Sequence, residues 1–214
     1  MRMEILKLTL LSLFLFITSC KPKEPKGKTL EEILSNASCN PPCWMEMTPG
    51  VTTIEETRQQ LAAHSNVIDQ DSIFDYAPTE AYLAKIGWQV KDSEIEGTLY
   101  YKTELLDHIY IRASEGKMNL KDGIALYGVP DKVIFEQSQC KISFGDSLCM
   151  RVTLHYPEKG LQLSYVQQEG DSDKLIIDPN QEIDLVLFFD PEVGLELDDN
   201  QTIDWPGYGV IDLQ

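Results

Sequence analysis

Residues 98–102, Thr-Leu-Tyr-Tyr-Lys, and residues 107–112, Asp-His-Ile-Tyr-Ile-Arg, decide the fold, because apolar and polar side chains alternate along both segments. A period of two is typical of half-buried strands, whose successive side chains point to opposite faces of a sheet. Further strands are predicted at 132–136, 150–156, 161–166 and 185–189. Pro157-Glu-Lys-Gly160 is predicted to turn the chain between two of them.

Capping signals predict three helices. Thr29 with Glu32 has the spacing of a capping box, Thr52 or Thr53 opens a helix that runs to about His64, and Asn119 opens one that Gly128 closes. Helices alternate with groups of antiparallel strands along the chain. The predicted class is therefore α+β, with two tandem helix-plus-antiparallel-strand units at 29–117 and 118–214, the second ending in an acidic tail.

The first twenty residues have the pattern of an export signal. A basic start precedes the apolar run 8–17, which is too short to span a bilayer, and small Thr18 and Ser19 precede Cys20. The tetrapeptide that ends at Cys20 resembles the processing site of bacterial lipoproteins. This resemblance implies a diacylglycerol on the Cys20 thiol and a fatty acyl chain such as palmitate on its amino group. The alternatives are cleavage by the general signal peptidase and an uncleaved membrane helix.

These features predict a signal peptide at 1–19 and a lipidated cysteine with a basic Pro/Lys tether at 20–28. The expected location is the cell envelope, with the protein lipid-anchored at Cys20 on the extracytoplasmic side of the cell membrane. Because an extended chain spans at most about 3.6 Å per residue, so short a tether keeps the folded body close to the lipid headgroups.

The chain is strongly acidic, with a formal net charge of −17. Residues 1–19 carry one net positive charge and 21–28 carry three, so residues 29–214 carry about −21. Nucleic acid is excluded as a partner, because its binding depends on Lys and Arg neutralising phosphates. A cationic or hydrophobic partner is expected instead, although acidity that serves only solubility is the simpler interpretation.

Four cysteines remain beside Cys20, and their spacing predicts two local disulfides, Cys39 with Cys43 and Cys140 with Cys149. Gly145-Asp146 is expected to turn a hairpin that brings the second pair together. A four-cysteine zinc site and a redox motif are the rivals, but neither pair has the Cys-x-x-Cys spacing that such sites use.

Two segments carry a family resemblance: residues 39–53, with Cys39-Asn-Pro-Pro-Cys43-Trp44 and Gly50-Val-Thr52, and residues 120–131, with Gly128-Val-Pro130. They resemble uncharacterised bacterial lipoproteins that have a Cys-Pro-Pro-Cys-Trp-like element. They are more distantly similar to the small lipoprotein of the β-barrel assembly machinery and to the β-lactamase-inhibitor-protein-like fold. The resemblance covers about a quarter of the chain and implies a binding or scaffold lipoprotein rather than an enzyme.

The sequence predicts no catalytic residues, no metal ligands and no cofactor. His64, His108 and His155 have no metal-binding spacing, although His108 and His155 could meet on one sheet face as a proton-transfer or metal pair. The acidic clusters lack the remaining positions of a calcium loop. A carboxylate pair formed only by tertiary contact stays open, and so does an extracytoplasmic enzyme with a carboxylate and histidine site.

Strand aromatics provide the candidate binding surface, which consists of Trp88, Tyr100, Tyr110 and Tyr165. Tyr100 and Tyr101 point to opposite faces, so one of them is available to a partner. The predicted function is a membrane-anchored binding module for another envelope protein or a ligand. A transporter's solute receptor is a third class, but its two lobes need a longer chain.

Overall fold

The computed structural model describes residues 27–142, 145–168, 174–195, 197 and 201–213, with side chains for all of these except 138–142, 145–148 and 168. The helices are α2 (Leu30–Ser35), α3 (Ile54–Ala63) and α4 (Leu120–Tyr127), with the 3-10 turns η1 (Gln70–Ser72) and η2 (Pro157–Lys159). The strands of the first half are β1 (Phe74–Tyr76), β2 (Ala84–Gln89), β3 (Ile95–Tyr101), β4 (Leu106–Ala113) and β5 (Met118–Asn119). Those of the second half are β6 (Lys132–Ile142), β7 (Gly145–Tyr156), β8 (Leu161–Gln168), β9 (Lys174–Ile177), β10 (Glu182–Ile183), β11 (Leu185–Phe189), β12 (Thr202–Asp204) and β13 (Gly209–Asp212).

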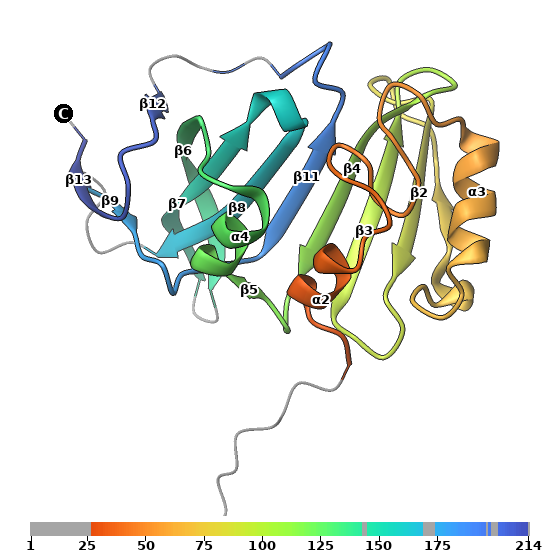
Figure 1. Ribbon diagram of the computed structural model, residues 1–214, viewed down its shortest axis with the longest axis horizontal. Coiled ribbons are helices and arrows are strands. Elements are labelled where there is room, and N and C mark those ends of the chain that lie inside the picture. The colour runs from red at the N-terminus through yellow and green to blue at the C-terminus, as the bar shows by residue number, and fades with distance from the viewer. Residues whose placement is uncertain (1–26, 143–144, 169–173, 196, 198–200, 214) are drawn as a thin grey trace, which may run out of the picture.

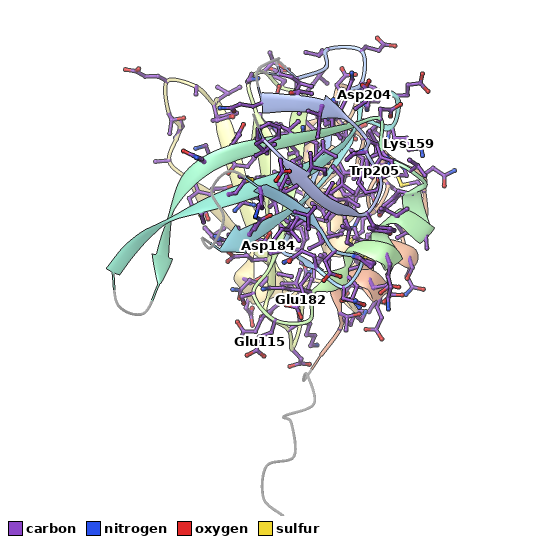
Figure 2. The ribbon with its side chains drawn as sticks, turned by 90° about the vertical axis from the view of Figure 1, so that its left-hand side faces the viewer. Glu115, Lys159, Glu182, Asp184, Asp204 and Trp205 are labelled. Carbon is purple, nitrogen blue, oxygen red and sulfur yellow. A yellow bond between two sulfur atoms is a disulfide. The ribbon has the colours of Figure 1, made fainter. Side chains whose placement is uncertain are left out.

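One nine-stranded antiparallel sheet organises the molecule, in the order β1-β2-β3-β4-β11-β8-β7-β6-β12 (Figure 1). Two small two-stranded sheets, β10-β5 and β13-β9, accompany it. The long β6–β7 hairpin projects beyond the rest of the molecule (Figure 2).

The predicted α+β class with two tandem helix-plus-strand units is wrong. The protein is mostly antiparallel sheet, and strands from both predicted units, 29–117 and 118–214, belong to the same large sheet. β11 lies between β4 and β8, so it pairs with one strand from each half. A strand finds its partners through hydrogen bonds to segments distant in sequence, and a local pattern does not contain that information. The division of the chain at 117/118 as a domain boundary stays a prediction.

One face of the sheet forms the core. Along one row of this face, Ile86 lies opposite Leu99, Leu99 opposite Ile109, Ile109 opposite Phe188 and Phe188 opposite Leu161. All five side chains are buried. The alternation that predicted the strands in 98–112 is therefore confirmed, and it directs every second side chain to this apolar face.

The helices α2, α3 and α4 lie on the core face. The hydroxyl of Tyr101, on the core phase of β3, donates to Thr57 of α3, and a Cβ on Gly123 of α4 would lie 3.0 Å from Leu163 of β8. α2 contacts α4, and both lie in front of the sheet in Figure 1. The opposite face of strands β1 to β4 therefore has none of the described helices over it.

The three predicted helix starts are confirmed, two of them by side-chain contacts. Thr29 with Glu32 and Thr53 with Glu56 each form a complete capping box at α2 and α3. Asn119 is the N-cap residue of α4, but its side chain makes no capping hydrogen bond. Gly128 ends α4 with a φ of 84°, a backbone conformation that favours glycine.

Candidate binding site on the open sheet face

The four residues of the predicted binding surface divide into two pairs. Trp88 and Tyr165 are 0% exposed and belong to the core, so neither contributes to a surface. Tyr100 and Tyr110 lie on the open face of β3 and β4, half-buried, with ring centroids 6.4 Å apart. The spacing along each strand explains their burial. Trp88 lies two residues after Ile86 on β2, and Tyr165 lies two residues after Leu163 on β8, so both point to the same core face as those residues.

Three further aromatic residues join Tyr100 and Tyr110 on this face. We call Phe74, Tyr76, Tyr82, Tyr100 and Tyr110 the aromatic cluster. Tyr82 lies 4.9 Å from Tyr100, and Phe74 lies 4.7 Å from Tyr76, as ring-centroid distances. Phe74 and Tyr76 are 48% and 45% exposed, although both are large apolar rings.

Strand register explains how these rings come together. Tyr76 of β1 is opposite Lys85 of β2, which is opposite Tyr100 of β3. Phe74 is opposite Gly87, and a Cβ on Gly87 would lie 2.4 Å from the Phe74 ring. The glycine therefore leaves the space that lets Phe74 lie flat on the sheet. Sequence reasoning missed β1, although Phe74-Asp75-Tyr76 has the alternation of a short strand.

A lysine and the burial of Tyr100 set the electrostatics of the cluster. The Lys85 ammonium lies 4.8 Å from the ring centroid of Tyr82 and 5.4 Å from that of Tyr100, within cation–π range. Burial raises the pKa of Tyr100, and the neighbouring phenols of Tyr110, Tyr82 and Tyr76 raise it further. The Tyr100 hydroxyl therefore stays protonated at neutral pH and can donate a hydrogen bond.

At one end of the cluster, His108 stacks on Tyr100 with ring centroids 4.4 Å apart. Its Nδ1 lies 2.7 Å from a carboxylate oxygen of Asp107, which also pairs with Lys102 at 3.2 Å. Burial lowers the pKa of His108 although Asp107 acts to raise it, so the imidazole is neutral at pH 7. In that state Nδ1 donates to Asp107 and Nε2 is an acceptor. Asp107 and His108 line a cleft of about 360 Å³ with Phe189 and Asp190.

His155 does not meet His108. The two histidines share the open phase of the sheet, but β11 and β8 lie between their strands. Strands are about 4.8 Å apart, so the separation is roughly 14 Å, too far for a shared metal or proton. His155 is buried, stacks on Phe189 at 5.5 Å and contacts Gln162. Within the described part of the chain, no three His, Cys, Asp or Glu side chains gather as a metal site would require.

The cysteines agree in part with the sequence prediction. Cys39 and Cys43 form a disulfide, as predicted. Cys149 is disulfide-bonded too, but the side chain of Cys140, its predicted partner, lies outside the described ones. In the β6–β7 register Cys140 is opposite Ser147, two residues from Cys149 and on the same face. The pairing of Cys140 with Cys149 therefore stays a prediction.

Cys20, the predicted lipidation site, also lies outside the described residues. Of the helices that the structure describes, none has the length and apolarity needed to cross a membrane.

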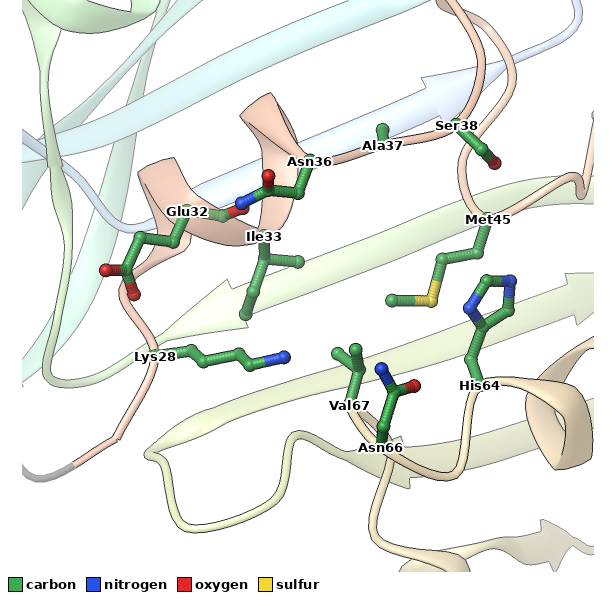
Figure 3. A pocket seen from close by; sticks show the side chains of 10 residues that line it. All are labelled: Lys28, Glu32, Ile33, Asn36, Ala37, Ser38, Met45, His64, Asn66 and Val67. Carbon is green, nitrogen blue, oxygen red and sulfur yellow. The ribbon is translucent and has the colours of Figure 1, made fainter.

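A larger cavity, of about 550 Å³, lies on the other side of the molecule between α2 and the chain that follows α3 (Figure 3). Its apolar walls come from Ile33, Met45 and Val67, and polar groups of Lys28, His64 and Asn66 line it. The sequence predicts no functional role for any of the residues that line it, His64 included.

No family model matches the chain, and neither a curated protein nor a solved structure matches it. The resemblance to small envelope lipoproteins therefore stays a prediction that depends on the residues quoted for it.

Proposed function

We propose that this protein is a lipid-anchored extracytoplasmic binding module, which binds another envelope protein through the open sheet face. The observation that carries the proposal is the aromatic cluster, whose rings are exposed (Phe74, Tyr76) or partly exposed on a face that none of the described helices covers. Phe74 and Tyr76 alone leave nearly half of their surface in water. Contiguous exposed apolar surface of this kind is typical of interaction sites.

The composition of the face fits a protein partner. Tyrosine combines a large rigid ring with a hydrogen-bonding hydroxyl, and it is enriched among the residues that dominate interface energies. Lys85 and the partly exposed Tyr82, Tyr100 and Tyr110 supply both kinds of contact on one flat surface. A partner that offers apolar groups to the rings and oxygen acceptors to Lys85 and the phenols would therefore be complementary to this face.

The anchor supports the proposal from the sequence side. Cys20 and the basic tether would hold the body near the headgroups, where other envelope proteins are concentrated. Cys20→Ala is expected to release the protein from membranes or leave it as an unprocessed precursor. Cell fractionation measures this, and unchanged processing with unchanged membrane retention would exclude the lipid anchor.

Photocrosslinking in intact cells tests the binding face. A benzoylphenylalanine at position 76 should capture a discrete partner, identified by mass spectrometry. The matched control carries the same residue at Tyr208, which is 47% exposed against 45% for Tyr76 but lies close to Asp122 of α4, on the helix side. Capture that is equal at both positions would argue against the sheet face as the binding site.

An extracytoplasmic enzyme is the second candidate, because Asp107 and His108 form a hydrogen-bonded pair in a cleft. The described lining of that cleft holds no serine or cysteine but includes Thr103, whose hydroxyl accepts the Leu105 amide at 3.2 Å, so the pair would act as a base toward that hydroxyl or toward water. If position 76 captures no partner at normal protein levels, this alternative is favoured. Loss of a hydrolytic activity in His108→Gln would then establish it.

A further inference from the structure

The cavity between α2 and the segment after α3 has the size and lining of a small-molecule site. Its volume of about 550 Å³ lies in the range of 300 to 1,000 Å³ that ligand pockets occupy. Ile33 and Val67 form apolar walls on opposite sides, and Met45 extends between them (Figure 3). The site is separate from the aromatic cluster, because Ile33 and Met45 belong to the helix side of the sheet.

One wall of this cavity depends on an unfavourable backbone conformation. Met45 and Glu46 have φ angles of 48° and 62°, in the left-handed region that favours glycine. They are the two central residues of a tight turn, in which the amides and carbonyls of Trp44 and Met47 bond each other at 2.9 Å. Turns with two positive φ values usually contain Asn-Gly, so a methionine here is costly. The turn directs the Met45 side chain into the cavity.

The surroundings hold this turn in place. Trp44 and Met47, on either side of it, are both fully buried. Trp44 stacks on Trp88 of β2 with ring centroids 4.8 Å apart, and the Cys39–Cys43 disulfide closes the chain just before the turn. The Met45 wall is therefore formed before any ligand binds, and binding does not have to order it.

The polar lining is rich in hydrogen-bond donors. Lys28 extends along the cavity toward Val67, and among the described residues no carboxylate pairs with its ammonium within 4 Å. Glu32, the carboxylate of this lining, is turned outward in Figure 3 and accepts the Thr29 amide at 2.9 Å as part of its capping box. A cation without a partner beside apolar walls is complementary to an anionic group on an apolar body.

We infer that this cavity binds a small amphiphilic carboxylate, whose apolar chain contacts Ile33, Met45 and Val67 and whose carboxylate pairs with Lys28. Free fatty acids and other monocarboxylates share this chemistry. The acidic body repels anions at long range, but at physiological salt that repulsion is screened beyond about 8 Å, whereas Lys28 acts in direct contact. Asn66 supplies an amide that can donate a second hydrogen bond.

Three six-carbon probes test the charge and the shape of the site separately. The full-length protein, in nanodiscs if it proves to be lipid-anchored and in buffer otherwise, is titrated with hexanoate, hexylamine and hexanol, with saturation-transfer NMR as the readout and the protein-free medium as the blank. Hexanoate should bind more tightly than both analogues. Equal affinity for hexanoate and hexanol, or a preference for hexylamine, would overturn the inference. A parallel titration with acetate shows whether the apolar chain is required, because the inference expects acetate to bind far more weakly.

A pair of variants locates the site. Lys28→Gln should weaken hexanoate about fivefold, the effect of one exposed ion pair, and leave hexanol unchanged. Lys121→Gln is the matched control, because it makes the same charge change on an exposed residue of α4. An equal effect of both variants would mean that hexanoate binds elsewhere. Crosslinking from position 76 should not change in Lys28→Gln, so this inference and the proposed function can fail independently.

Discussion

Trp44 stacks on Trp88 with ring centroids 4.8 Å apart and planes inclined by 19°, and both side chains are 0% exposed. The contact joins the disulfide-closed loop before α3 to the second strand of the large sheet. Neither indole nitrogen has a hydrogen-bond partner among the described groups, so packing alone holds the pair. The aromatic cluster and the cavity lie on opposite sides of the sheet that this contact stabilises.

Gly97 provides the space for this stack. A Cβ at position 97 would lie 2.0 Å from the Trp88 ring, and the ring cannot move because Trp44 covers it. We expect Gly97→Ala to lower the free energy of unfolding by about 3 kcal/mol, the upper end of overpacking effects. Urea denaturation measures it, and Glu96→Ala, at the exposed neighbour in the same strand, is the control. A loss no larger than that of the control would contradict the predicted clash.

Tyr101 and Thr57 join α3 to the sheet through a buried hydrogen bond of 2.6 Å, which the tyrosine hydroxyl donates. Tyr101→Phe should cost about 1 kcal/mol of unfolding free energy, because it leaves a buried Thr57 oxygen without that donor. A double-mutant cycle with Thr57→Val isolates the pair. If the cycle gives no coupling energy, the contact does not stabilise the fold. The phenol itself should titrate late, because burial raises the pKa of Tyr101 to about 12.

Glu46 is exposed and has a φ of 62°, so glycine should be favoured at this position. Glu46→Gly is expected to raise the free energy of unfolding by about 0.5 to 1 kcal/mol, since relief of the left-handed conformation exceeds the entropy cost of glycine. Glu55→Gly, an exposed glutamate inside α3, should instead lower it by about 1 kcal/mol. Thermal unfolding compares the two. A destabilising Glu46→Gly would show that the turn is not strained.

Acid should destabilise the fold through its buried histidines. Burial lowers the pKa of His155 although Asp131 acts to raise it, and burial lowers the pKa of His108 as well. A group whose pKa is lower in the folded state contributes fully above its unfolded pKa of about 6.5, and this stability is lost as the pH falls through the folded pKa. His155→Gln should therefore reduce the pH dependence of unfolding between pH 7 and 5. An unchanged slope would mean that His155 can be protonated without cost.

Cys149 is predicted to bond Cys140. Mass spectrometry of unreduced tryptic peptides should find the two residues linked, alongside the Cys39–Cys43 pair. Cys149 linked to any other cysteine would contradict the hairpin register as the cause of the pairing.

The helices illustrate how far local signals reach. A capping box joins residues three apart, and the Gly128 amide that ends α4 bonds a carbonyl four residues earlier. Because these contacts are local, the sequence showed where α2, α3 and α4 begin and end. The strands in 98–112 were visible for the same reason, because their alternation is local. Several strands were missed. Most of them have two to four residues, and such short runs carry too little periodicity: β1, β5, β9, β10, β12 and β13. β2 has six residues and was also missed.

The candidate site depended on information of another kind. Trp88 and Tyr100 both looked like strand aromatics, but Trp88 faces the core and Tyr100 the open side. Which face is open follows from where the helices lie, and that is a property of the assembled sheet. The Met45 wall of the cavity was equally hidden, because nothing in a Met-Glu pair indicates positive φ angles.

By itself, the sequence determined the helix boundaries, the alternating strands, the Cys39–Cys43 disulfide and the acidity of the body, all of which follow from composition or near neighbours. Only the tertiary structure decided that both halves share one sheet, that Tyr100 lies beside the other rings of the aromatic cluster and that Lys28 lines a cavity. The reason is physical, because strand pairing and face coverage join residues that are tens of positions apart. A single local segment does not specify such contacts.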